Sequence, residues 1–151
     1  MIMMLRQVFA FQDWGSWLKP PYLPTVLLSL LKLMKSYLFV LRKPAHNGAY
    51  LQEMLDIILT TAAFDQSVSI LWLDDAVFQL KNQQQPEVLG MKDTAAMLQS
   101  LSIYDVTELC TETESLQERG LTLDALCLPV QALPRTDIGA FMQGFDIVFA
   151  G

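Results

Sequence analysis

The stretch SYLFVLRKPAHNGAYLQEMLDIILTTAAFDQSVSILWL, residues 36–73, predicts the fold class of this chain. It begins with Ser36–Leu41 and ends with Ser67–Leu73, two short runs that contain aromatic and β-branched residues. Both runs are apolar at odd and even positions, which is typical of strands covered on both faces. Between them, Leu51–Ala62 places its apolar residues on one stripe of a helix. A strand, a helix and a second strand in this order indicate a parallel α/β unit.

The same alternation continues toward the C-terminus. Three further runs have the length and composition of strands: Asp105–Cys110, Leu126–Val130 and Asp146–Ala150. Helices are predicted between the strands, from Asp93 as N-cap through Leu101, over Glu112–Arg119 with Gly120 as the residue that ends it, and over Asp137–Gly144. We therefore predict one α/β domain with a five-stranded parallel sheet flanked by helices.

The composition excludes several classes of protein. The chain has 151 residues, 52% of them hydrophobic and 17% charged, with a formal net charge of −6, so it is neither intrinsically disordered nor suited to bind nucleic acid directly. Two cysteines and one histidine supply neither a disulfide framework nor a zinc site, and no glycine-rich phosphate loop occurs. We expect a reduced cytoplasmic protein without metal or cofactor. The mean hydropathy of +0.32 predicts that apolar surface is covered by a partner subunit.

Residues 1–33 differ from the rest of the chain because basic residues outnumber acidic ones there. The apolar run Thr25–Leu33 is interrupted by Lys32 after fewer than ten residues, too short for a membrane span. We expect residues 1–33 to be a leader outside the domain, non-native or disordered, and residues 34–151 to form the domain. A membrane-tethered protein that uses this leader is the weakest alternative.

The loop after the first predicted strand carries His46, Asn47 and Gly48. Ligands and partners of open α/β sheets lie at the carboxyl ends of the strands. Asn47 or Gly48 can cap the following helix, whose free N–H groups favour an anion. His46 is either a proton donor or RNA-side contact, or a loop histidine bonded to nearby backbone, and the second interpretation is favoured.

The two cysteines differ in their expected reactivity. Cys110 ends a predicted strand just before a short helix, a suitable place for a reactive thiol. The acidic residues around it, Glu108 and Glu112 among them, oppose formation of a thiolate. Cys127 lies between two leucines inside a predicted strand, so we expect a buried inert thiol there.

The acidic residues have two interpretations as well. Glu108, Glu112, Glu114 and Glu118 form either a solvated face or a docking site for a basic partner, and a solvated face is the commoner case. Asp74 and Asp75 follow the second predicted strand, where carboxylates serve more often in turns and caps than as metal ligands.

Four segments together resemble the DsrE/F-like family of sulfur-relay proteins, in its DsrF-like branch. They are the P-x-H-x-G loop (residues 44–48), LDDAVFQL (73–80), IYDV (103–106) and SLQERGL (115–121). The resemblance extends from about Lys35 to Phe149. It implies a flavodoxin-like domain, and it makes Asp75 and Phe78, with residues 46–48, candidate interface or loop positions.

The resemblance also implies a function and partners. The family members form a dimer of heterotrimers, a heterohexamer, with TusB-like and TusD-like subunits, and pass persulfide sulfur to a downstream acceptor. The sulfur ends in 2-thiolation of the tRNA wobble uridine, in 5-methylaminomethyl-2-thiouridine.

In the TusD-like subunit the relay cysteine lies eight residues before the glycine of an R-G turn. The corresponding position here, counted from Gly120, is Glu112, and a carboxylate cannot hold a persulfide. The resemblance therefore implies a non-catalytic structural subunit, with no membrane or direct nucleic-acid partner. The alternative is a sulfurtransferase subunit that carries a persulfide on Cys110.

Overall fold

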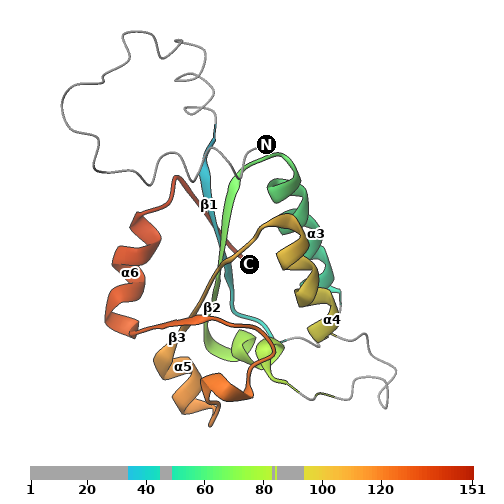
Figure 1. The fold of residues 1–151 in the computed structure, drawn as a ribbon. Helices are drawn as coiled ribbons and strands as arrows, with labels where there is room; N and C mark the ends of the chain where they lie inside the picture. The colour runs from blue at the N-terminus through green and yellow to red at the C-terminus, as the bar shows by residue number, and fades with distance from the viewer. Residues whose placement is uncertain (1–33, 45–48, 83, 85–93) are drawn as a thin grey trace, which may run out of the picture. The chain divides into compact units, whose positions relative to one another are not determined.

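Five parallel strands form one sheet in the computed structural model, which describes residues 34–44, 49–82, 84 and 94–151 (Figure 1). The strands are β1 (Ser36–Leu41), β2 (Ser67–Trp72), β3 (Glu108–Glu112), β4 (Gln131–Leu133) and β5 (Ile147–Ala150). The α/β class and the five-stranded parallel sheet are thereby confirmed. The strands lie in the order β4-β3-β2-β1-β5, whereas flavodoxin itself has the order 2-1-3-4-5.

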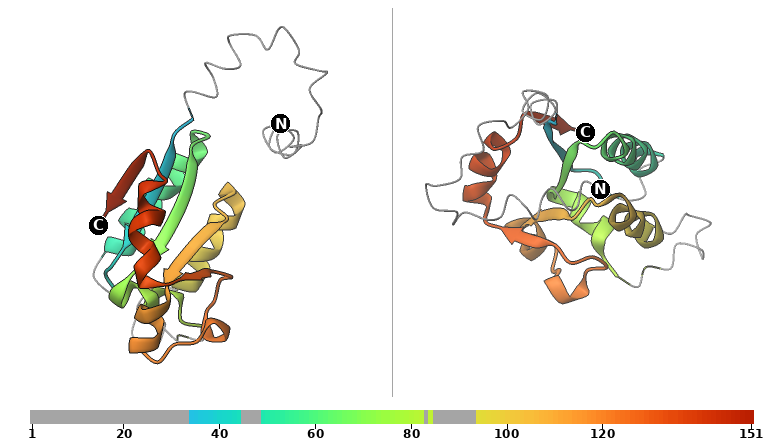
Figure 2. Two further views of the ribbon diagram at one scale, coloured as in Figure 1. Left: turned by 90° about the vertical axis from the view of Figure 1, so that its left-hand side faces the viewer. Right: turned by 45° about the horizontal axis from the view of Figure 1, so that its top comes forward.

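Helices cover both faces of this sheet. The α-helices are α3 (Tyr50–Ala63), α4 (Thr94–Gln99), α5 (Thr113–Glu118) and α6 (Arg135–Gln143), and the 3-10 helices are η1 (Asp74–Leu80), η3 (Ser100–Tyr104) and η4 (Leu123–Ala125). Helices α3 and α4 lie on one face and α6 on the other (Figures 1 and 2). The hand of the crossovers explains this arrangement. Strands β1 to β4 follow one another in one direction across the sheet, so their right-handed connections lie on one face. The connection through α6 runs back to β5 on the other side of β1, so a right-handed crossover places α6 on the opposite face.

The central strands are apolar on both faces because both faces are buried. In β1, Phe39 and Leu41 pack with the buried stripe of α3, while Leu38 and Val40 pack with Ile138 of α6. The parallel register pairs Phe39 with Ile70 and thus keeps side chains of one face together. The apolar stripe predicted in the first helix is confirmed, since its buried residues are Leu51, Met54, Leu55 and Ile58.

The prediction of a strand at Leu126–Val130 is wrong. The fourth strand is Gln131–Leu133, and the preceding residues form a loop whose Cys127 N–H donates to the carbonyl of Leu80. Pro129 has no N–H to donate to a sheet ladder, which explains why this apolar segment packs beside the core without joining the sheet.

The third strand begins later than predicted, at Glu108 and not at Asp105. Asp105 adopts a left-handed backbone conformation with φ of 58° at the end of η3, so the chain turns there before it becomes extended. The predicted helix that ends at Leu101 is shorter than expected, because α4 ends at Gln99 and gives way to η3. Its predicted N-cap, Asp93, lies outside the described residues, as does the expected leader, residues 1–33.

The end of α5 follows the prediction closely. Gly120 comes directly after the C-cap residue Arg119 and has φ of +65°, a conformation that L-residues other than glycine rarely adopt. Its N–H donates to the carbonyl of Gln117, which closes the helix. Within the part of the chain that the structure describes, no helix has the length and apolarity needed to cross a bilayer.

Candidate functional site at the carboxyl ends of the strands

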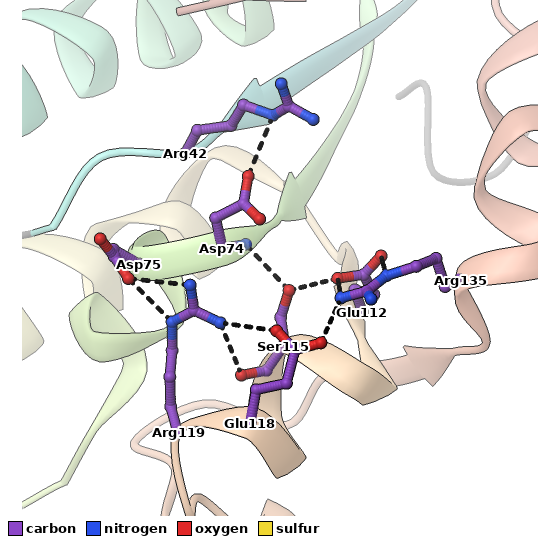
Figure 3. Close-up of polar contacts among 8 residues, drawn as sticks. All are labelled: Arg42, Asp74, Asp75, Glu112, Ser115, Glu118, Arg119 and Arg135. Atoms are coloured by element: carbon purple, nitrogen blue, oxygen red, sulfur yellow. Dashed lines mark hydrogen bonds and ion pairs between the residues drawn. The ribbon is translucent and has the colours of Figure 1, made fainter.

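The carboxyl ends of β1, β2 and β3 lie level with one another. The register pairs Leu41 with Trp72, and Trp72 with Thr111. The residues that follow, Arg42, Asp74 and Glu112, therefore lie on one edge of the sheet, where α5 and the first turn of α6 add further charged side chains (Figure 3). This edge is where ligand sites of open α/β sheets are found.

Glu112 is the most buried charged residue of this edge, with 6% of its surface exposed. Arg135 donates to both carboxylate oxygens, from Nε to Oε1 at 2.8 Å and from Nη2 to Oε2 at 3.0 Å. The hydroxyl of Ser115 donates to Oε2 as well. The hydrogen bonds from Arg135 hold the pKa of the Glu112 carboxyl below its ordinary value, Ser115 lowers it further, and burial opposes them. Glu112 is therefore an ionised carboxylate whose charge is compensated inside the protein.

Arg135 binds more than one acidic residue. Its Nη2 lies 2.9 Å from Oε1 of Glu118, and its backbone N–H donates to Glu114 at 2.8 Å. These contacts tie the first turn of α6 to α5 and to the end of β3. The pKa of the Arg135 guanidinium is raised, first by its hydrogen bond to Glu112 and then by that to Glu118.

The predicted solvated acidic face is found only in part: Glu108 and Glu118 are exposed, whereas Glu112 is buried. Three of its members, Glu112, Glu114 and Glu118, contact Arg135, and Glu118 also lies 3.5 Å from Arg119. The fourth, Glu108, accepts a hydrogen bond from the hydroxyl of Ser69. Most of this acidic charge is used within the domain.

The two longest family-like motifs meet at this edge. Ser115 of SLQERGL accepts a hydrogen bond from the backbone N–H of Asp74 at 2.9 Å and donates to Glu112. Arg119 donates to Asp75 from two nitrogens, at 2.8 and 2.9 Å. Asp74 itself has φ of 52° and pairs with Arg42 at 3.3 Å. Motifs that are about 40 residues apart in the sequence thus form one polar network (Figure 3).

Gln79, in the LDDAVFQL motif, is a structural residue that carries no prediction of its own from the sequence. Its side chain is fully buried, accepts a hydrogen bond from the indole Nε1 of Trp72 at 3.0 Å and donates to the carbonyl of Lys43 at 2.7 Å. Gln79 therefore joins η1 to the segment that follows β1. No local pattern predicts this burial, because among the residues three and four positions away only Ala76 is apolar.

Cys110 lies within β3, two residues before the strand ends, and is 1% exposed. It packs with Leu38, Leu71 and Ile138 on the α6 side of the sheet. Burial, with a further contribution from the charge of Glu108, raises the pKa of its thiol to about 11. At neutral pH the thiol is protonated and enclosed, which is the opposite of what a nucleophilic cysteine requires.

The other residues that the sequence predicted as candidates do not form a single site. Cys127 is partly exposed and lies in a loop, so the strand predicted around it is wrong. Phe78 exposes 37% of its surface on η1, beside buried neighbours, and Asp75 is held by Arg119. His46, Asn47 and Gly48 lie outside the described residues.

The carboxylates at this edge of the sheet are neutralised by arginine side chains. Among the described residues, Asp74, Asp75, Glu112 and Glu118 each pair with an arginine, and no three side chains of the kinds that ligate metals come together. Of the two thiols, Cys110 is enclosed within β3, and Cys127 lies in the loop whose backbone N–H binds the carbonyl of Leu80 at the end of η1.

Comparison with known proteins places these features in context. A family model described as the DsrE/DsrF-like family matches residues 35–150. A Pseudomonas aeruginosa protein named "Protein TusC homolog" is 38% identical over 116 residues, which cover 77% of this chain and 98% of that protein. The "Intracellular sulfur oxidation protein DsrF" of Allochromatium vinosum is 37% identical over 95 residues, 63% of this chain and 70% of that protein.

The fold has a counterpart among solved structures. The ychN protein from E. coli superposes with a TM-score of 0.67 at 16% sequence identity, over 78% of this chain and 100% of that chain. At this identity the similarity is one of fold.

Proposed function

Since the chain belongs to the DsrE/DsrF-like family, which confirms the resemblance found in its motifs, we propose that it is a non-catalytic structural subunit of a sulfur-relay complex. In this proposal it assembles in the cytoplasm with TusB-like and TusD-like subunits as a dimer of heterotrimers. The complex passes persulfide sulfur to a downstream acceptor for 2-thiolation of the tRNA wobble uridine. The chain itself carries no sulfur and binds neither nucleic acid nor membrane.

The observation that carries this proposal is the environment of Glu112. Counting from Gly120, Glu112 stands where the resemblance places the relay cysteine of the TusD-like subunit. Its carboxylate is buried and bound by Arg135 and Ser115. A carboxylate cannot form a persulfide, and this one is also enclosed by its partners, which supports a role in assembly over a role in sulfur transfer.

The alternative, that Cys110 carries the persulfide, has less support. A persulfide forms when a thiolate attacks the sulfane sulfur of a donor, so the cysteine must be ionised and accessible. Cys110 is 1% exposed, and its thiol pKa is raised to about 11. An incoming sulfur would also have to displace Ile138 or its neighbours in the core on the α6 side.

Exposed apolar side chains support the proposal that this chain associates with other subunits. Large hydrophobic residues of several elements expose between 37% and 79% of their surface, namely Ile57, Phe64, Phe78, Ile103, Tyr104, Leu123, Val148 and Phe149. Two of them, Val148 and Phe149, belong to β5, an edge strand of the sheet. Apolar side chains on an open sheet edge favour association with another chain.

The test replaces this chain's thiols inside the complete complex. Cys110→Ser, Cys127→Ser and the double variant are each expressed in place of the native chain in cells that contain its partners. We expect wild-type levels of 2-thiouridine in tRNA from all three, and a heterohexamer by native mass spectrometry of the purified complex. Loss of thiolation in Cys110→Ser while the complex still assembles, or a mass increase of one sulfur atom on Cys110 after incubation with a donor, would establish the alternative.

A further inference from the structure

The Glu112 carboxylate sits among hydrogen-bond donors of the kind that bind free oxyanions. Oε1 receives Nε of Arg135 at 2.8 Å, and Oε2 receives Nη2 of Arg135 at 3.0 Å together with the hydroxyl of Ser115. A planar guanidinium that binds two oxygens of one group is the usual protein partner of carboxylates and other oxyanions. The carboxylate is thus held as a bound ligand would be, although it belongs to the chain.

These donors are also held in place by contacts that do not involve Glu112. Arg135 pairs with Glu118 at 2.9 Å, and its backbone N–H donates to Glu114. The Ser115 hydroxyl oxygen accepts the N–H of Asp74 at 2.9 Å. Because both side chains have a second anchor, they should keep their positions when the carboxylate is removed.

We propose that Arg135 and Ser115 form a site for a small oxyanion at the carboxyl end of β3, and that Glu112 fills it with its own carboxylate. A tethered carboxylate competes at a high effective concentration, so free anions are excluded from the intact site. In the relay, and here the inference rests on the proposed function, the site would reject small anionic sulfur species such as thiosulfate. Glu118 shares the guanidinium, so the emptied site should bind anions weakly.

The experiment empties the site and offers it an external anion. Glu112→Ala removes a CH2–COO unit, which is the size of acetate. The melting temperature of the full chain is measured against increasing acetate at constant ionic strength in chloride. We expect the variant to melt below wild type and to gain about 3 °C or more in a saturable manner, with a smaller saturable gain in thiosulfate, whereas the wild-type protein responds to neither anion beyond the effect of chloride.

Matched variants separate this site from general effects of salt. In the double variant Glu112→Ala/Arg135→Met the acetate response should disappear, because the guanidinium is gone. Glu112→Gln should show none either, since its side chain still fills the site. Asp56→Ala removes an exposed carboxylate of α3, which packs on the other side of the sheet, and serves as the control for loss of one negative charge.

Three results would overturn the inference: no response of Glu112→Ala beyond that of wild type, an equal response of the double variant, or an equal response of Asp56→Ala. If Glu112→Ala does not fold in chloride, its refolding yield in acetate is measured, and failure to recover counts against the site. None of these measurements involves sulfur transfer. Their failure would leave the proposed function intact, while thiolation lost with Cys110 would refute that function and leave the anion site standing.

Discussion

Arg135 binds both oxygens of Glu112, at 2.8 and 3.0 Å, and so joins the end of β3 to the beginning of α6 across 23 residues of sequence. This ion pair differs from those on most protein surfaces because the carboxylate is buried while half of the arginine side chain remains exposed. Loss of Arg135 would leave the Glu112 carboxylate without a counter-charge in a place from which water is largely excluded. The pair therefore stabilises the edge of the sheet at which the candidate site lies.

Glu112 should give the protein a pH-dependent part of its stability. Its carboxyl pKa is lower in the folded state than its ordinary value of 4.5, so the stabilisation is present above that value and is lost as the pH falls through the folded pKa. We expect Glu112→Gln to be less stable than wild type at pH 7, with a difference that shrinks as the pH is lowered below about 4. Urea denaturation at a series of pH values measures this.

Asp146 also has a lowered carboxyl pKa, because it accepts hydrogen bonds from Ser36. The wild type and the Glu112→Gln variant both contain Asp146, so the contribution of Asp146 to the pH dependence cancels in their difference in stability. A difference that stays constant from neutral to acidic pH would mean that Glu112 stabilises the protein by packing and not by charge.

Replacement of Ser115 by alanine should destabilise the fold by about 1–3 kcal/mol, since it leaves the N–H of Asp74 without its acceptor and removes one donor from Glu112. The measurement is chemical denaturation followed by circular dichroism. Ser102→Ala is the matched control, because the Ser102 hydroxyl donates to the exposed carbonyl of Gln99. Its effect should stay within about 0.5 kcal/mol. Equal effects of the two variants would show that the bridge between the motifs contributes little.

Gln79→Leu should cost about 1–3 kcal/mol, because it leaves the indole N–H of Trp72 unpaired in the core and removes the donor to the carbonyl of Lys43. Leucine has a similar volume, so the loss would report hydrogen bonding more than packing. The exposed Gln117 on α5 provides the control Gln117→Leu. A Gln79→Leu protein as stable as wild type would show that the buried amide does not anchor η1.

The thiol of Cys110 should resist alkylation in the folded protein. With a pKa of about 11 and 1% exposure, it is neither ionised nor accessible at pH 8. We expect iodoacetamide to modify the partly exposed Cys127 first, and Cys110 only in guanidinium chloride. Peptide mapping by mass spectrometry separates the two sites, and the Cys127→Ser variant leaves Cys110 as the single thiol. Alkylation of native Cys110 at the rate of a free thiol would contradict the structure and favour its role as a sulfur carrier.

The sequence predicted those elements of the fold that are specified by residues close together in the chain. The alternation of strand and helix, the buried stripe of α3 and the left-handed Gly120 all follow from side-chain periodicity or backbone sterics. The strand at Leu126–Val130 was predicted wrongly, because its apolar residues do pack against the core, but through a loop bonded to Leu80. Hydrophobicity indicates burial and does not distinguish a strand from an irregular segment.

The sequence by itself determined the class of the fold and the family, because apolar periodicity and short motifs are properties of neighbouring residues. It also determined that position 112 has a carboxylate and no thiol. Only the tertiary structure decided what that carboxylate does. Whether Glu112 faces water, a partner or Arg135 depends on where α6 returns across the sheet, and that return brings together residues that no local pattern relates.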